Sequence, residues 1–172
     1  MNISHEQLQE LSEEIALINR LAAIITSSMD IQEIFDGFTD ELKKIIDVDW
    51  ATIALLDGNQ FYLLALSSTI GSTWQTEERI PLKGTATEWV CREKKSLYEA
   101  NLAQYHRFWT GEAHLKRGIC SIVYLPLIIK DNNIGSLILA SHRPNAYSLK
   151  QIRVLEQVAL QIATPIENSQ LY

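Results

Sequence analysis

Two pairs of strand-like runs, each joined by a short polar turn, constrain the fold of this chain more than any other feature. The first pair covers residues 50–68 and turns at residues 57–60 (DGNQ), and the second covers residues 120–142 and turns at residues 130–133 (KDNN). Apolar runs of this length around an Asp-Gly or Asn-rich turn are typical of β-hairpins. Two such hairpins predict an antiparallel sheet.

Helical periodicity brackets these strands at both ends of the chain. Near the N-terminus, apolar residues from Leu8 to Met29 are spaced alternately three and four apart, as in the seam of a coiled-coil helix. A second stripe that contains Leu17 and Leu21 predicts that this helix also packs on its own domain. Further helices are predicted over residues 31–46 and from Ser148 onward, where the spacing of three and four recurs.

The two spaced rows predict a homodimer that pairs through the terminal helices. A helix that packs only within its own chain is the alternative explanation of the N-terminal row. The residues predicted to lie in the dimer interface are Leu8, Leu11, Ile15, Ile18, Ala22, Ile25, Ile162 and Ile166.

The middle of the chain contains shorter elements. Short strands are predicted at residues 79–82 and 96–99 and a short helix at residues 84–94, whereas residues 100–118 have no clear period. The order of two helices, a hairpin, a mixed middle, a second hairpin and a final helix predicts an α+β fold rather than alternating βαβ units.

Composition excludes several classes of protein. The 172 residues, 47% of them apolar, suffice for one domain with its own core. The two cysteines exclude a disulfide framework and favour a reducing compartment, so we expect a cytoplasmic protein. No apolar run approaches the roughly 18 residues of a membrane span. Residues 1–49 carry 11 acidic and 3 basic side chains, which argues against a nucleic-acid-binding arm.

Motifs of catalysis and metal binding are missing from the sequence. The seven glycines form no phosphate-binding loop, and no nucleophile elbow is present. His106 and His114 lie eight residues apart, with no cysteine or paired carboxylate to complete a metal set. We therefore expect no metal, no cofactor and no catalytic residue, with Cys91 and Cys120 as inert thiols. A Cys–His pair that meets only in the folded chain stays open as an alternative.

Aromatic and basic side chains gather in the irregular middle of the chain, where Trp74 and Tyr98 also lie. Aromatic residues on loops often line a ligand pocket, but they can also fill a core beneath those loops. The basic residues can attract an anionic part of a ligand or form a solvated surface. The residues predicted to bind a small molecule are Trp89, Tyr105, Arg107, Phe108, Trp109, His114, Lys116 and Arg117.

An ordered set of short motifs follows in the C-terminal half. The set comprises Ser121-x-x-x-Leu125-Pro126-Leu127, Ile134-Gly135-x-Leu137-x-Leu139-Ala140, Tyr147-Ser148, Leu155, Val158-Ala159, Gln161-Ile162-Ala163 and Ile166-Glu167-Asn168-Ser169. This set resembles the GAF domain, a small-molecule sensor module of many signalling proteins. The resemblance covers roughly residues 29–172 and leaves residues 1–28 as a separate N-terminal helix. Tyr147, where many members carry Phe, and Pro165, where Ala is more usual, depart from the pattern.

The resemblance implies a sheet of five or six antiparallel strands with the terminal helices on one face. A pocket for an unidentified ligand is implied on the other face, beneath residues 84–118. The resemblance also implies dimerisation through the terminal helices and an output domain, such as a histidine kinase, in a longer protein of which this chain is a segment.

Motifs of particular GAF subfamilies restrict which members of the family this chain resembles. Members that attach a bilin use a Cys beside a His, and cyclic-nucleotide-binding members carry an N-K-x-x-F-D-E signature; the sequence contains neither. Haem-binding members use a pocket histidine, a role open to His106 or His114. Two further alternatives are a domain with a filled pocket that only dimerises and relays, and a thiol enzyme similar to the free methionine sulfoxide reductases, which use three spaced cysteines.

Overall fold

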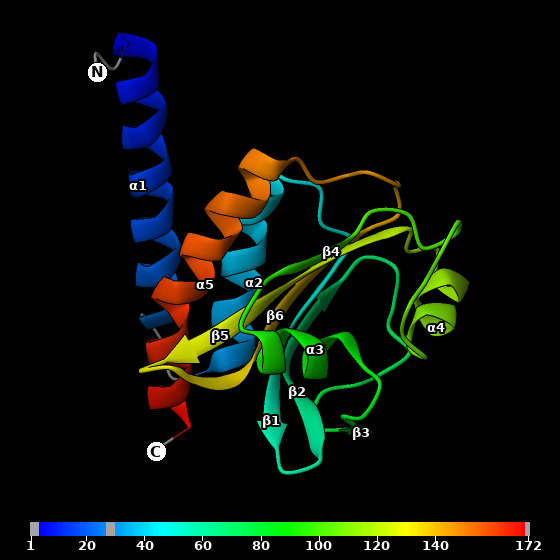
Figure 1. The fold of residues 1–172 in the computed structure, drawn as a ribbon. Coiled ribbons are helices and arrows are strands. Elements are labelled where there is room, and N and C mark those ends of the chain that lie inside the picture. Colours follow the sequence, from blue (N-terminus) through cyan, green and yellow to red (C-terminus); the bar gives the residue numbers. More distant parts are fainter. Residues whose placement is uncertain (1–3, 27–29, 171–172) are drawn as a thin grey trace.

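The structure, a computed structural model, describes residues 4–26 and 30–170 and contains a sheet covered on both faces (Figure 1). Three long helices cover one face, and two short helices with long loops cover the other. In chain order the elements are α1 (His5–Thr26), α2 (Ile31–Lys43), β1 (Trp50–Asp57), β2 (Gln60–Ser68), β3 (Arg79–Pro81), α3 (Ala86–Glu93), β4 (Leu97–Glu99), α4 (Gly111–Lys116), β5 (Ser121–Ile129), β6 (Asn132–Ser141) and α5 (Leu149–Ser169).

The sheet has six strands in the order β3-β2-β1-β6-β5-β4. Every neighbouring pair is antiparallel. The strands β1 and β2 form one hairpin and β5 and β6 the other, which confirms both predicted hairpins. At the centre of the sheet β1 pairs with β6, so the two hairpins join into one surface. The predicted α+β fold is confirmed.

One face of the sheet packs against α1, α2 and α5 and forms the larger of two hydrophobic cores. Alternate residues of β1, such as Ala51 and Ile53, point to these helices because successive side chains of a strand face opposite sides. Ile162 and Ile166 of α5 are fully buried in this core. Their assignment to a dimer interface was therefore wrong: the spaced apolar row of α5 is the stripe that packs on its own sheet.

Helix α1 divides its apolar residues between two directions. Leu17 and Leu21 are buried in the core against the domain. Leu8, Leu11 and Ile15 are 50%, 49% and 52% exposed, and in Figure 1 the N-terminal half of α1 extends beyond the rest of the domain. The helix therefore packs on its own chain along one stripe and presents another to the surface.

The rest of the predicted seam is only partly described. Ile18 is partly buried against the core of its own chain. The side chains of Ala22 and Ile25 lie outside the described part of α1, as does the predicted boundary between residues 28 and 29.

The second face of the sheet is covered by α3, α4 and the loops around them, over a smaller core. The helix α4 lies within residues 100–118, where the sequence shows no period. A helix of six residues is less than two turns long, too short for an apolar row to repeat. Its presence here therefore depends on packing, through buried His114, rather than on pattern.

Pro126 lies where β5 becomes the edge of the described sheet. It pairs with Ser136 of β6 on one side, while the pairing with β4 on the other side ends at Tyr124. A proline has no N–H to donate, so it is tolerated at a strand edge. This placement accounts for a proline in an otherwise central-looking apolar run.

Gly135 is required by the close approach of β6 to β1. A Cβ atom at this position would lie 1.9 Å from the carbonyl oxygen of Ala54. Because that oxygen belongs to the backbone of a central strand, Gly135→Ala should lower the free energy of unfolding by about 3 kcal/mol or more, measured by urea denaturation. Gly58→Ala is the control: its φ is +63° with no atom within 4 Å of the added Cβ, so a loss of about 1 kcal/mol is expected. Equal losses in the two variants would contradict the clash.

Candidate functional site

A small cavity lies between the second face of the sheet and the elements that cover it. Its volume is about 20 Å³, which is room for about one water molecule. The sheet supplies its floor, and the loop before β3, the first turn of α3 and the helix α4 supply its roof. The lining residues are Trp50, Phe61, Leu63, Trp74, Ile80, Thr85, Ala86, Thr87, Thr110, His114, Tyr124 and Ile138.

A chain of hydrogen bonds ties the roof of the cavity to its floor. The indole Nε1 of Trp50, the first residue of β1, donates to the Ser72 hydroxyl at 3.0 Å. That hydroxyl donates to the carbonyl oxygen of Trp74 at 2.5 Å. Arg117, after α4, donates to the carbonyl oxygen of Ser72 at 3.3 Å. The loop that carries Trp74 is therefore held from both the sheet and α4.

Four rings meet edge to face from the sheet to the surface. The Trp50 and His114 ring centroids are 5.3 Å apart, and the Trp74 and His114 centroids are also 5.3 Å apart. Trp74 then meets Trp109 at 6.3 Å, and Trp109 is half-exposed. Edge-to-face contacts stabilise such a set beyond the burial of its area. Trp74 therefore links His114, which lines the cavity, to Trp109, which does not.

His114 is a buried and uncharged histidine. Its side chain is 6% exposed, and burial lowers its pKa from 6.5 to about 4, because the charged imidazolium loses its hydration. Among the described residues its ring nitrogens have no hydrogen-bond partner. Tyr124 lines the same cavity, and burial raises the pKa of its hydroxyl. At neutral pH both groups are available as neutral donors or acceptors.

The first turn of α3 supplies backbone donors at the cavity wall. The Thr85 hydroxyl caps the helix by accepting from the Glu88 N–H at 3.2 Å. Thr87 is fixed by a 2.9 Å hydrogen bond to Ser136 of β6. The N–H groups of Ala86 and Thr87 belong to the first helical turn, whose N–H groups have no partner within a helix.

The charge balance of the cavity favours an uncharged occupant. No lysine, arginine, aspartate or glutamate lines it. The N-terminus of a helix stabilises an anion by about 1 kcal/mol, whereas burying a carboxylate without a cationic partner costs several kcal/mol. The desolvation cost therefore exceeds what the first turn of α3 provides.

Among the eight residues predicted to bind ligand, His114 lines the cavity. Phe108 is buried and Trp89 partly buried in the core around it. Trp109 lies in the outer layer, where its Nε1 donates to the Lys83 carbonyl oxygen at 3.0 Å. Tyr105 is 72% exposed on the loop before α4.

The predicted basic residues lie on the surface around the roof. Arg107 stacks over the rings of Trp89 and Phe108, with its guanidinium carbon 5.4 Å and 5.3 Å from their centroids. Lys116 and Arg117 are exposed. None of these three cations is among the residues that line the cavity.

Sequence reasoning did not include Trp50, Trp74 and Tyr124 among the ligand residues. Trp50 and Tyr124 lie within apolar runs that form the buried strands β1 and β5, so the sequence pattern predicts that they are core residues. Trp74 follows Gly71, Ser72 and Thr73 in a loop, and an isolated aromatic residue in a polar loop is a signal that could have identified it.

Comparison with known proteins identifies the family to which this arrangement belongs. The family model described as "GAF domain" matches residues 28–167. The chain is a GAF domain. The match covers the whole sheet, both hairpins and most of α5, and the predicted resemblance is confirmed.

Two similar proteins are named as parts of signalling or regulatory systems. The GAF domain of a two-component sensor histidine kinase from Bacillus halodurans has a TM-score of 0.74 and 20% identity, over 84% of this chain and 99% of that one. The formate hydrogenlyase transcriptional activator FhlA from Escherichia coli (strain K12) is 23% identical over 99% of this chain. The chain spans about a quarter (26%) of the length of this curated relative.

An enzyme shares the same fold. The free methionine-R-sulfoxide reductase from Neisseria meningitidis, solved with its substrate, has a TM-score of 0.72 at 13% identity, over 99% of this chain and 96% of that one. At this identity the likeness establishes the fold alone.

The two cysteines of this GAF domain lie at opposite ends of one strand. The Cys91 thiol contacts the carbonyl oxygen of Gly135 at 3.4 Å, and the Cys120 N–H donates to the carbonyl oxygen of Ser141 at 2.9 Å. Gly135 and Ser141 are six positions apart along β6, or about 20 Å at the rise of a strand, so the thiols are too distant for a disulfide. Burial raises the pKa of Cys91 to about 12, which keeps it a protonated thiol.

Within the described residues, no group of three or more His, Cys, Asp or Glu side chains is placed to hold a metal ion. The cavity is also far too small for a haem. No helix in the described part of the chain combines the length and apolarity needed to cross a bilayer.

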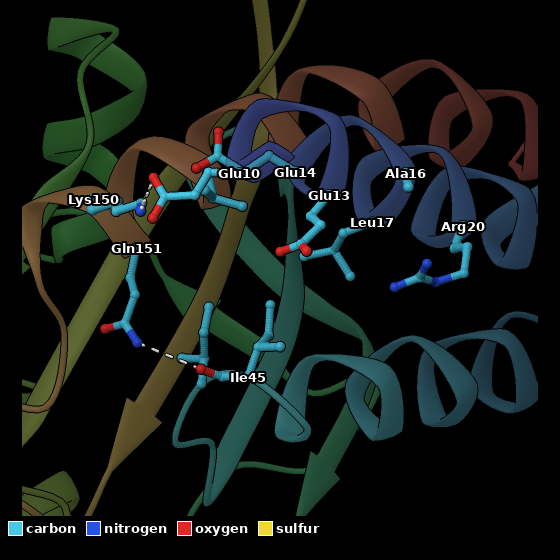
Figure 2. Close-up of a pocket in the computed structure, with 11 residues that line it drawn as sticks. Glu10, Glu13, Glu14, Ala16, Leu17, Arg20, Ile45, Lys150 and Gln151 are labelled. Atoms are coloured by element: carbon cyan, nitrogen blue, oxygen red, sulfur yellow. Dashed lines mark hydrogen bonds and ion pairs between the residues drawn. The ribbon is translucent and has the colours of Figure 1, made fainter. Parts of the chain in front are cut away.

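An open groove of about 490 Å³ lies under α1 on the other side of the sheet (Figure 2). Its apolar floor includes Leu17 and Ile46, and Glu10 of its rim pairs with Lys150 of α5 at 2.8 Å. That pair is exposed, so it contributes little to stability. The groove shows that α1 is attached along a narrow stripe around Leu17 and Leu21.

Burial of neutral His114 should make the stability of the domain depend on pH. Below pH 6.5 the unfolded chain binds a proton at this histidine that the folded chain refuses until about pH 4. The free energy of unfolding should therefore fall by about 3 kcal/mol as the pH drops through this interval.

The variant His114→Phe keeps a ring between Trp50 and Trp74 and removes this proton. It should lose that part of the pH dependence in urea denaturation, measured at about pH 7, above the interval, and at about pH 4.5, near its lower end. His5→Gln, at an exposed position of α1, is the control and should behave as the wild type. The same slope in His114→Phe and the wild type would contradict the burial of a neutral ring.

Proposed function

We propose that this GAF domain is a non-catalytic regulatory module of a larger cytoplasmic signalling protein. It binds a small molecule in the cavity under Trp74, dimerises through α1 and passes a signal along its terminal helices to an output domain. The observation that carries this proposal is the division of α1, with one stripe buried in the domain and another exposed.

The exposed stripe has the form of a helix-pairing surface. Leu8, Leu11 and Ile15 are about half exposed, and they are spaced three and four apart, as in a helical seam. A run of large apolar side chains on the surface is typical of an interaction site. Since α1 also packs against α5, a partner helix on this stripe is mechanically connected to the end of the domain.

The relatives support a place in a larger protein. The similar structure is one domain of a sensor histidine kinase, and the region similar to this chain is 26% of the length of the transcriptional activator. We infer a similar arrangement here, with α1 and α5 leading to the neighbouring segments.

Ile15→Glu tests the dimer. A charge in the seam is buried without a partner or prevents pairing, so the dissociation constant should rise about 100-fold or more. Light scattering at micromolar concentration should give a dimer for the wild type and a monomer for Ile15→Glu, while circular dichroism stays unchanged. Gln9→Glu adds the same charge at an exposed position outside the seam and should stay dimeric. A monomeric wild type, or dissociation of both variants alike, would count against dimerisation through α1.

A second candidate function is a relay module without a ligand. The observation that favours it is the cavity of about 20 Å³, which aromatic side chains nearly fill. Native mass spectrometry of freshly purified protein separates the two candidates: a bound small molecule favours the sensor, and a bare dimer favours the relay. The separation of Cys91 from Cys120 gives no support to a two-thiol enzyme.

A further inference from the structure

We propose that Trp74 occupies the place of the ligand in the closed state, and that the cavity admits a small uncharged ring compound bearing a hydrogen-bond acceptor. This inference rests on the proposed function, since it names the ligand class of the same site. The compound binds by displacing the Trp74 indole, and the loop that carries Trp74 moves with it.

The ring contacts explain why a ring compound fits. The Trp74 indole lies edge to face against His114, with 5.3 Å between the centroids and 64° between the planes. The Trp50 indole meets the same His114 ring at 5.3 Å and 66°. An aromatic ligand that takes the place of Trp74 keeps the contact with His114 and the apolar floor, so the closed and bound states exchange one ring for another.

The polar groups explain why the ligand carries an acceptor. The N–H groups of Ala86 and Thr87 start a helix and lack backbone acceptors. Thr110, which carries a hydroxyl and is only 7% exposed, lines the same cavity. Among the described residues none of these donors has a hydrogen-bond partner. A carbonyl or amide oxygen satisfies them without bringing a buried charge, and no cationic side chain lines the wall to pair with a carboxylate.

The attachment of the Trp74 loop explains how displacement is transmitted. Ser72 bonds both to Trp50 of β1 and to the Trp74 carbonyl, and Arg117 bonds to the carbonyl of Ser72. Moving Trp74 out of the cavity therefore alters contacts with the start of β1 and with the end of α4.

The test uses benzamide, benzoate and benzylamine, which have similar size and differ in charge. In the variant Trp74→Ala, benzamide should bind once per chain and about ten-fold or more tighter than to the wild type. In the wild type a closed form populated above about 90% leaves less than about a tenth of the protein able to bind, which weakens the apparent affinity about ten-fold or more. Benzoate and benzylamine should bind about ten-fold or more weaker than benzamide. Isothermal titration calorimetry gives the affinities and the stoichiometry.

Trp109→Ala is the matched control, since it removes a tryptophan that contacts Trp74 but does not line the cavity. It should bind benzamide no better than the wild type. Equal binding by Trp74→Ala and Trp109→Ala would overturn the displacement, and tighter binding of benzoate than of benzamide would overturn the uncharged class.

Two additional measurements keep the test decisive if Trp74→Ala is unstable. Trp74→Leu keeps an apolar plug but removes the ring, so it should show the same order of affinities. In the wild type, millimolar benzamide should increase amide hydrogen exchange in residues 70–78, and no change in that segment would refute the displacement. Dimerisation through α1 is measured separately by light scattering. Failure to bind benzamide would therefore not contradict the relay function, and a monomeric wild type would not contradict the binding site under Trp74.

Discussion

The two layers that cover the sheet are required because the sheet is apolar on both faces. In β1 Trp50 and Ala54 face one core, while Ala51 and Ile53 face the other. Each fully buried large apolar side chain stabilises the fold by about 1.5–3 kcal/mol, so neither face can be left to water. Long helices cover one side, where their apolar stripes are continuous. The other side is covered by short helices and loops, whose irregular shape leaves a cavity.

The same strands therefore connect the cavity to the terminal helices. Tyr124 lines the cavity, and its neighbours Val123 and Leu125 in β5 lie in the core beneath the helices. Helix α5 packs directly against β5. Because protein cores are closely packed and adjust in discrete steps, a shift of the strand beneath the cavity is also a shift of the surface that holds α5. This connection is a physical path for the proposed relay.

Periodicity predicted the elements that repeat. The hairpins, α2 and α5 follow from patterns of two and of three to four, and Ser148 and Gln151 form a capping box at the start of α5. The departure at Tyr147 also has a local explanation, since its hydroxyl donates to the Asp47 carbonyl oxygen at 2.7 Å. The pattern could not decide whether an apolar stripe packs on its own sheet or on a partner helix. The stripe of α5, which contains Ile162 and Ile166, packs on the sheet.

The candidate site was harder to predict because its parts come from distant segments. Periodicity marks Trp50 and Tyr124 as core residues, and only the folded sheet shows that the core on this side contains a cavity. The gathering of aromatic residues in one stretch of sequence pointed to the side of the sheet where the small cavity lies, and to His114, which lines it. It also included Tyr105, which is exposed, because closeness in sequence is a poor measure of closeness in an irregular segment.

The basic residues Arg107, Lys116 and Arg117 lie on the surface of the domain and not in the cavity. The guanidinium of Arg107 rests on Trp89 and Phe108 from outside, so its charge stays hydrated and its stem covers apolar surface. Such a cation contributes to the electrostatic potential around the roof of the cavity, but solvent and salt screen that potential over about 10 Å. Inside the cavity the neutral groups of His114 and Tyr124 and the ring of Trp74 remain. For the proposed ligand, selection therefore depends on shape and on hydrogen bonding inside the cavity, and the surface charges act only from outside it.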